Sequence, residues 1–196
     1  YLLVAVAVGT YPRQQVTGSQ AFLFYLLAYT LATMGAFAVV IALAQAGERH
    51  EDVADYAGLW NTRPMLALSM AVFMLALLGF PIAGGMGFFA KWYVLQAALS
   101  GPVPLVFLSV MLVLASVISA GYYLYVIMVM FMRPRPAGAA EFEHTPPLTE
   151  FVIGAAVVLL LVFGVFPGRV VQWARDSVPP SSIRVAPTPT ALGPQR

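Results

Sequence analysis

The residue best suited to chemistry is Lys91, the only lysine in this chain of 196 residues. It is also the only charged side chain between Arg63 and Arg133, in a strongly apolar stretch. An ionisable group deep in a membrane costs about 3 kcal/mol or more on insertion scales, and such groups typically mark ion or proton pathways. Desolvation disfavours the charged form of a buried amine, so a lysine there can exchange its proton during a reaction cycle. Lys91 is therefore our candidate proton relay.

Lys91 follows a segment dense in glycine and proline, which a continuous helix tolerates poorly. The predicted helix break comprises Gly79, Pro81, Gly84, Gly85 and Gly87. The apolar runs on either side are each about 13–15 residues, or roughly 20 Å of helix, which is too short to span a bilayer comfortably. We expect one discontinuous transmembrane helix with unwound backbone near the bilayer middle, an arrangement that transporters use for ion sites. The alternative is two short spans joined by a tight turn, which would place the lysine near one membrane face.

A later apolar run carries hydroxyl groups that could extend a proton path from the lysine. The candidates are Ser116, Ser119, Tyr122 and Tyr123. Each also has a simpler interpretation, because small serines favour close helix contacts in lipid and tyrosines pack or anchor helices at the membrane interface.

The composition places most of the chain in a membrane and excludes several classes of function. Hydrophobic residues make up 61% and charged residues 9%, whereas a soluble domain has about 25% charged residues. Cysteine is absent, which excludes disulfides and thiolate metal sites. The net charge of +2 is too small for a nucleic-acid surface. His50 and His144 stand in polar loops and are interpreted as solvated, so no metal site is predicted.

Apolar stretches separated by polar loops predict an all-α, polytopic transmembrane helix bundle. The first nine residues are apolar but too few to cross a bilayer, so we interpret them as the end of a truncated transmembrane helix and the chain as the C-terminal part of a longer protein. The predicted elements are this helix end at 1–9, transmembrane helices at 21–46, 103–132 and 148–168, the broken helix at 64–100, and an interfacial segment with a disordered tail at 169–196.

The residues around the break resemble a known family. The signature has two parts, Gly79-Phe-Pro81 and Gly87-Phe-Phe-Ala-Lys91-Trp-Tyr93. It is similar to a signature of the antiporter-like membrane subunits of the proton-pumping NADH:quinone oxidoreductase, respiratory complex I. Four further stretches resemble subunit N in particular: Tyr1-Leu-Leu-Val4, the run from Tyr25 to Val40, Asp55-Tyr-Ala-Gly-Leu59 and the run from Ser116 to Leu124. The resemblance covers residues 1 to about 166.

This resemblance implies a fold of fourteen transmembrane helices with two inverted five-helix repeats, each containing a broken helix. The chain would hold the end of the tenth helix and the eleventh to fourteenth, and Lys91 would match the lysine that the family uses in proton translocation toward the periplasm. The implied function is a proton-translocating membrane subunit that couples quinone reduction to proton transfer. Its partners would be the lipid bilayer and the other membrane subunits of complex I in a bacterial inner membrane. No cofactor would lie on this chain; NADH, FMN, iron–sulfur clusters and quinone would lie on partner subunits.

The sequence departs from the family pattern in two places. The break looks two residues longer than usual, through Gly84-Gly85-Met86, and Tyr125 stands where the family usually has arginine.

Two alternative functions remain open at this point. One alternative is a subunit of a cation/proton antiporter or membrane-bound hydrogenase of the same fold. The other is a scaffold subunit, in which Lys91 only ties helices together.

Overall fold

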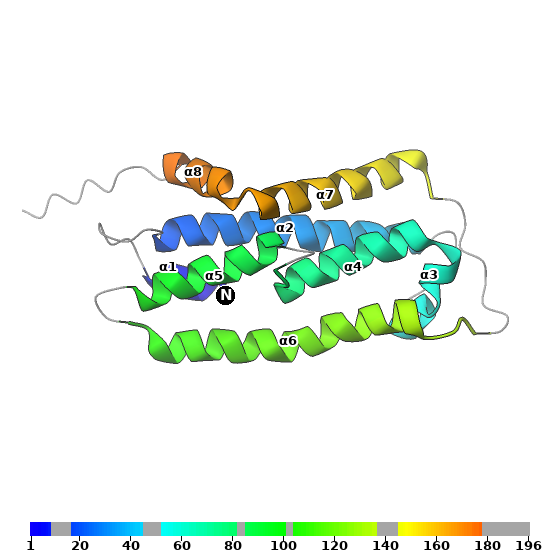
Figure 1. The fold of residues 1–196 in the computed structure, drawn as a ribbon, viewed down its shortest axis with the longest axis horizontal. Coiled ribbons are helices and arrows are strands. Elements are labelled where there is room, and N and C mark those ends of the chain that lie inside the picture. Colours follow the sequence, from blue (N-terminus) through cyan, green and yellow to red (C-terminus); the bar gives the residue numbers. More distant parts are fainter. Residues whose placement is uncertain (9–16, 45–51, 82–84, 101–103, 137–144, 178–196) are drawn as a thin grey trace, which may run out of the picture.

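The molecule is a bundle whose long helices lie roughly along one axis (Figure 1). The computed structural model describes residues 1–8, 17–44, 52–81, 85–100, 104–136 and 145–177, and all regular structure in these ranges is helical, which confirms the predicted all-α class. The elements are α1 (Leu2–Val8), α2 (Gly18–Leu43), the 3-10 helix η1 (Val53–Tyr56), α3 (Leu59–Thr62), α4 (Pro64–Leu78), α5 (Gly85–Leu99), α6 (Val106–Met132), α7 (Pro147–Val165) and α8 (Pro167–Ser177).

Three of the described helices are long and apolar enough to cross a membrane: α2, α6 and α7. Helix α2 begins three residues before the predicted start, because Thr17 and Gln20 form a capping box. The Thr17 hydroxyl accepts a bond from the Gln20 amide at 3.4 Å, and the Gln20 side chain accepts one from the Thr17 amide at 3.2 Å. This pairing satisfies two amides that a helix start otherwise leaves without partners.

The predicted helix at 148–168 is divided in the structure. Helix α7 ends at Val165, Phe166 leaves the helical backbone region, and α8 begins at Pro167. Proline suits the first turn of a helix but disfavours helical backbone at the residue before it. The predicted interfacial segment thus lies on α8 as far as Ser177, and the tail predicted to be disordered, from residue 178 onward, lies outside the described residues.

Helix α2 lies at the centre of the bundle and contacts α1, α4, α5 and α7 (Figure 1). Its buried face is dominated by small side chains, which let helix backbones approach closely in lipid. These buried small residues are Gly18, Ala21, Ala28, Ala32, Gly35, Ala36 and Ala42. Helix α6 lies on the far side of α4 and α5 from α2 (Figure 1).

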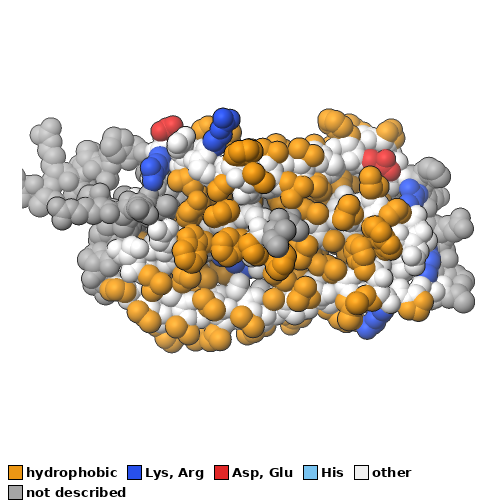
Figure 2. All heavy atoms as spheres, viewed as in Figure 1, with side chains coloured by type: hydrophobic (Ala, Val, Ile, Leu, Met, Phe, Trp, Pro, Cys, Tyr) orange, Lys and Arg blue, Asp and Glu red, His pale blue; other side chains and the backbone are white. Residues whose placement is uncertain are grey.

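The outer surface of the bundle is largely apolar. Figure 2 shows hydrophobic side chains over the middle of the molecule and most charged side chains near its two ends. Helix α6 contributes many of the exposed apolar side chains, including Phe107, Val117 and Ile118. Such a surface suits contact with lipid or with other membrane helices, because apolar patches of this extent are rare on soluble monomers.

Candidate proton-transfer site at the break between α4 and α5

Helix α4 ends at Leu78, inside the apolar region, and Gly79 follows as its C-cap. This glycine has φ of 85°, a left-handed conformation that a residue with a Cβ adopts only with strain. Its amide donates to the carbonyls of Leu75 and Ala76, both at 3.0 Å, and the Phe80 amide donates to Leu75 at 2.9 Å. These bonds satisfy part of the helix end and turn the chain away from the α4 axis.

Helix α5 begins at Gly85, so two of the residues predicted to be unwound, Gly85 and Gly87, are helical instead. A Cβ at position 87 would overlap the carbonyl oxygen of Ala76, which means that the first turn of α5 lies directly against the last turn of α4. Beyond this overlap the two helices continue in nearly the same direction along the bundle (Figure 1). Pro81 lies in the connection, and Gly84 lies outside the described residues.

The Lys91 side chain crosses this break and joins three elements. Its Nζ donates to the carbonyl oxygen of Leu78, the last residue of α4, at 2.8 Å. It also donates to the Oγ of Ser116 on α6 at 2.8 Å. The ring centroid of Tyr1 lies 5.2 Å from the same nitrogen, within the range of a cation–π contact.

These partners can hold a positive charge without a carboxylate. Helices α1, α2, α4, α5 and α6 contain no Asp or Glu. The Leu78 carbonyl belongs to the C-terminal turn of α4, where the helix dipole is negative and carbonyls have no intrahelical donor. Lys91 therefore acts as a side-chain cap for α4 that is supplied by α5.

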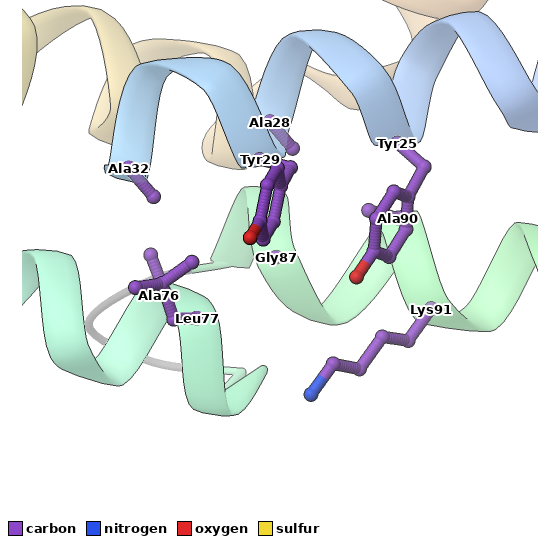
Figure 3. Close-up of a pocket in the computed structure, with 9 residues that line it drawn as sticks. All are labelled: Tyr25, Ala28, Tyr29, Ala32, Ala76, Leu77, Gly87, Ala90 and Lys91. Carbon is purple, nitrogen blue, oxygen red and sulfur yellow. The ribbon is translucent and has the colours of Figure 1, made fainter. Parts of the chain in front are cut away.

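Space is open on two sides of Lys91. A small cavity of about 20 Å³ faces α2 (Figure 3). On the other side, a groove of about 320 Å³ runs between α5 and α6, with mostly apolar walls that include Ser116. The amine is therefore partly buried, with open space beside it on both sides.

Of the hydroxyls proposed from the sequence, Ser116 is the one that contacts the lysine. Ser119 instead donates from its Oγ to the carbonyl of Ser116 at 3.0 Å, within its own helix. The Tyr122 side chain is 71% exposed. Tyr123 packs beside the buried cluster around α2 and α4, close enough to Tyr29 of α2 to interact with it electrostatically. Ser116 is thus the candidate that bonds the amine directly.

The sequence analysis missed a group of tyrosines near the lysine. Tyr25 of α2 stacks on Tyr1, with ring centroids 5.4 Å apart, and on Tyr29, at 6.0 Å. Tyr25 and Tyr29 line the small cavity together with Lys91. Their spacing of four residues in a mostly apolar helix puts both side chains on one face, a signal that could have identified them.

The different bonding of the two serines gives a matched test. We expect Ser116→Ala to slow proton transfer by about tenfold or more, because a hydrogen bond to a charged group contributes about 1.5–3 kcal/mol and about 1.4 kcal/mol is a factor of ten in rate. Ser119→Ala should have little effect, because that hydroxyl bonds only its own helix among the described residues. Proton uptake by membrane vesicles that carry each variant measures the difference, and equal effects would contradict the assignment.

Comparisons with known proteins identify the family of the chain. Residues 1–119 match the family model described as NADH:quinone oxidoreductase/Mrp antiporter, TM. The chain is 50% identical over 182 residues to NADH-quinone oxidoreductase subunit N of Gemmatimonas aurantiaca, which covers 93% of this chain and 34% of the relative. It is 40% identical over 173 residues to the subunit N of Chloroflexus aggregans, covering 87% of this chain and 33% of the relative.

A solved structure, respiratory complex I from Thermus thermophilus with bound aureothin, contains a similar chain. The TM-score is 0.65 at 34% identity, and the match covers 88% of this chain and 36% of that chain. The chain thus spans about a third of the length of the relatives it matches. The matched model, these relatives and the shared helical fold confirm the resemblance to complex I subunit N, and the chain belongs to the NADH:quinone oxidoreductase/Mrp antiporter transmembrane family.

Proposed function

We propose that this chain is part of a proton-translocating membrane subunit of NADH:quinone oxidoreductase and that Lys91 carries the proton at its broken helix. The observation that supports the proposal is the position of the Lys91 amine, which bonds both the Leu78 carbonyl at the break and the Ser116 hydroxyl of α6. An amine between two helices can change its hydrogen-bond partners when the helices move. Its protonation can then respond to conformational changes elsewhere in an assembly.

In this proposal the oxidation of NADH and the reduction of quinone take place on partner subunits. The energy reaches Lys91 as a change in the field or in the helix positions around it, and the amine releases a proton to one side and takes one from the other. The partners are the other membrane subunits of complex I. The location is a bacterial inner membrane, since the relatives named subunit N come from bacteria.

Two other functions have some support. The description of the family model includes Mrp antiporters, so a cation/proton antiporter is one; the names of the curated relatives favour complex I over it. A scaffold role is the other, because the bond from Lys91 to Leu78 ties α5 to α4.

Lys91→Ala in the assembled complex tests the relay against the scaffold. We expect the complex to assemble and its proton-pumping rate to fall by about tenfold or more, because no other ionisable group lies in α4, α5 or α6 to take over the proton, apart from the tyrosines. The measurements are the amount of assembled complex and proton uptake by inverted vesicles during NADH oxidation. An unchanged proton-pumping rate and proton-to-electron ratio in the Lys91→Ala complex would support the scaffold role. A requirement for sodium in the unchanged protein would support the antiporter.

A further inference from the structure

The small cavity beside Lys91 has room for one water molecule. It lies between α2 and the break, and Tyr25, Tyr29, Leu77 and Lys91 are among its lining residues (Figure 3). The space open to the centre of a water molecule is about 20 Å³, and about 10–15 Å³ of such space is needed for one water.

The polar groups around this cavity match what a buried water requires. In Figure 3 the tyrosine side chains leave α2 with their hydroxyl ends directed toward the break, and the Lys91 amine lies beside the end of α4. Leu77, which also lines the cavity, belongs to the last turn of α4, where carbonyls have no intrahelical donor. A buried water typically makes about three hydrogen bonds, and these groups can supply them.

Ring stacking holds the two hydroxyls in place. Tyr25 lies between Tyr1 and Tyr29 with nearly parallel rings, at interplanar angles of 15° and 14°. The Tyr25 side chain is 8% exposed, whereas Tyr29 is 45% exposed at the outer end of the row. The row therefore leads from the buried cavity toward the surface of the described bundle.

We propose that Tyr25 and Tyr29 hold a water molecule against Lys91 and relay protons between it and the α2 side of the bundle. This inference rests on the proposed proton-transfer function. The Lys91 ammonium gives one proton to the water, and the water passes one of its own protons to a tyrosine oxygen. That tyrosine gives its own hydroxyl proton to a second water molecule at the exposed end of the row, beside Tyr29. Each relaying oxygen gains and loses one proton, so the net change is the transfer of one proton from Lys91 to the second water.

The test replaces only the hydroxyls, because phenylalanine keeps the stacked rings. Tyr25→Phe, Tyr29→Phe and the double variant are assembled into the complex and compared with Tyr125→Phe, a control tyrosine on α6 that does not line the cavity. Proton pumping is divided by the amount of assembled complex and measured in H₂O and in D₂O. We expect the double variant to pump several-fold more slowly, with a larger solvent isotope effect and an unchanged KM for quinone. A role in packing alone would not change the isotope effect.

The outcomes separate this inference from the proposed function. A double variant that pumps at the wild-type rate with the wild-type isotope effect would overturn the water path. If Lys91→Ala stops pumping in the same assay, the relay role of the lysine would stand without it. If Lys91→Ala pumps normally, the proposed function itself fails. A slower double variant with an unchanged isotope effect would also count against the water path.

Discussion

Lys91→Arg is expected to leave the complex assembled and to stop proton transfer at this site. Arginine keeps the positive charge and can donate to the Leu78 carbonyl and the Ser116 hydroxyl, the two partners of the lysine. The groove between α5 and α6 offers space for the larger head group. A guanidinium does not release its proton in proteins, since its pKa is above about 12. The neutral form would be rarer than about one in 10⁵ at pH 7, and any cycle that requires it would slow by far more than tenfold.

The arginine variant also separates charge from proton exchange. The amount of assembled complex, the NADH oxidation rate with an artificial electron acceptor and the proton-pumping rate are measured on the same vesicles. We expect the amount of assembled complex and the NADH oxidation rate to stay near wild type, and proton pumping to be lost. Pumping at the wild-type rate would show that a fixed charge is sufficient at position 91 and would exclude the relay mechanism.

Gly87→Ala is expected to have the largest effect on folding, although it adds one methyl group. The new Cβ would overlap the backbone oxygen of Ala76, and a backbone atom cannot move aside by changing rotamer. Helices α4 and α5 would have to separate, which would also draw Lys91 away from Leu78. Overpacking typically costs about 1–3 kcal/mol and occasionally more, and domains are stable by only about 5–15 kcal/mol. We expect much less assembled complex and a lower melting temperature.

A glycine on α7 provides the matched control for this prediction. Apart from the nearby backbone of its own helix, no described atom lies within 4 Å of a Cβ built at Gly154. Alanine is favoured over glycine inside a helix by about 1 kcal/mol, so Gly154→Ala should be neutral or slightly stabilising. Equal amounts of assembled complex for the two variants would show that α4 and α5 do not approach as closely as described.

The sequence alone predicted the helical class and the position of the lysine beside an interruption, and the resemblance of its motifs predicted the family. The first two predictions follow from features that act locally, namely long apolar runs, glycine with proline, and a charge isolated among apolar residues. The extent of the interruption was harder to predict. Gly85 and Gly87 have low helix propensity, yet both are helical. The backbone of α4 leaves no room for a Cβ at Gly87, and the backbone of α7 lies 3.3 Å from where a Cβ at Gly85 would be. Tertiary packing therefore overrides local propensity at these positions.

The partners of the lysine depend even more on tertiary structure. Ser116 was one of several hydroxyls on the same helix, and only the rotation of α6 against α5 determines which of them meets the amine. The carbonyl of Leu78 is a backbone group that no sequence motif marks. Tyr25 and Tyr29 are far from Lys91 in the sequence, and they reach it because α2 lies at the centre of the bundle.

The bond between Lys91 and the end of α4 has a thermodynamic consequence. An ammonium stabilises the terminal carbonyl of Leu78 more strongly than a neutral amine does, so proton occupancy and the local backbone conformation are linked. Linkage is reciprocal: a displacement that lengthens this bond favours deprotonation, and deprotonation makes the same displacement easier. Two conformers of the interrupted span would then differ in protonation without a carboxylate in the described part of the site, and a small shift transmitted along the bundle could be converted into the release of one proton.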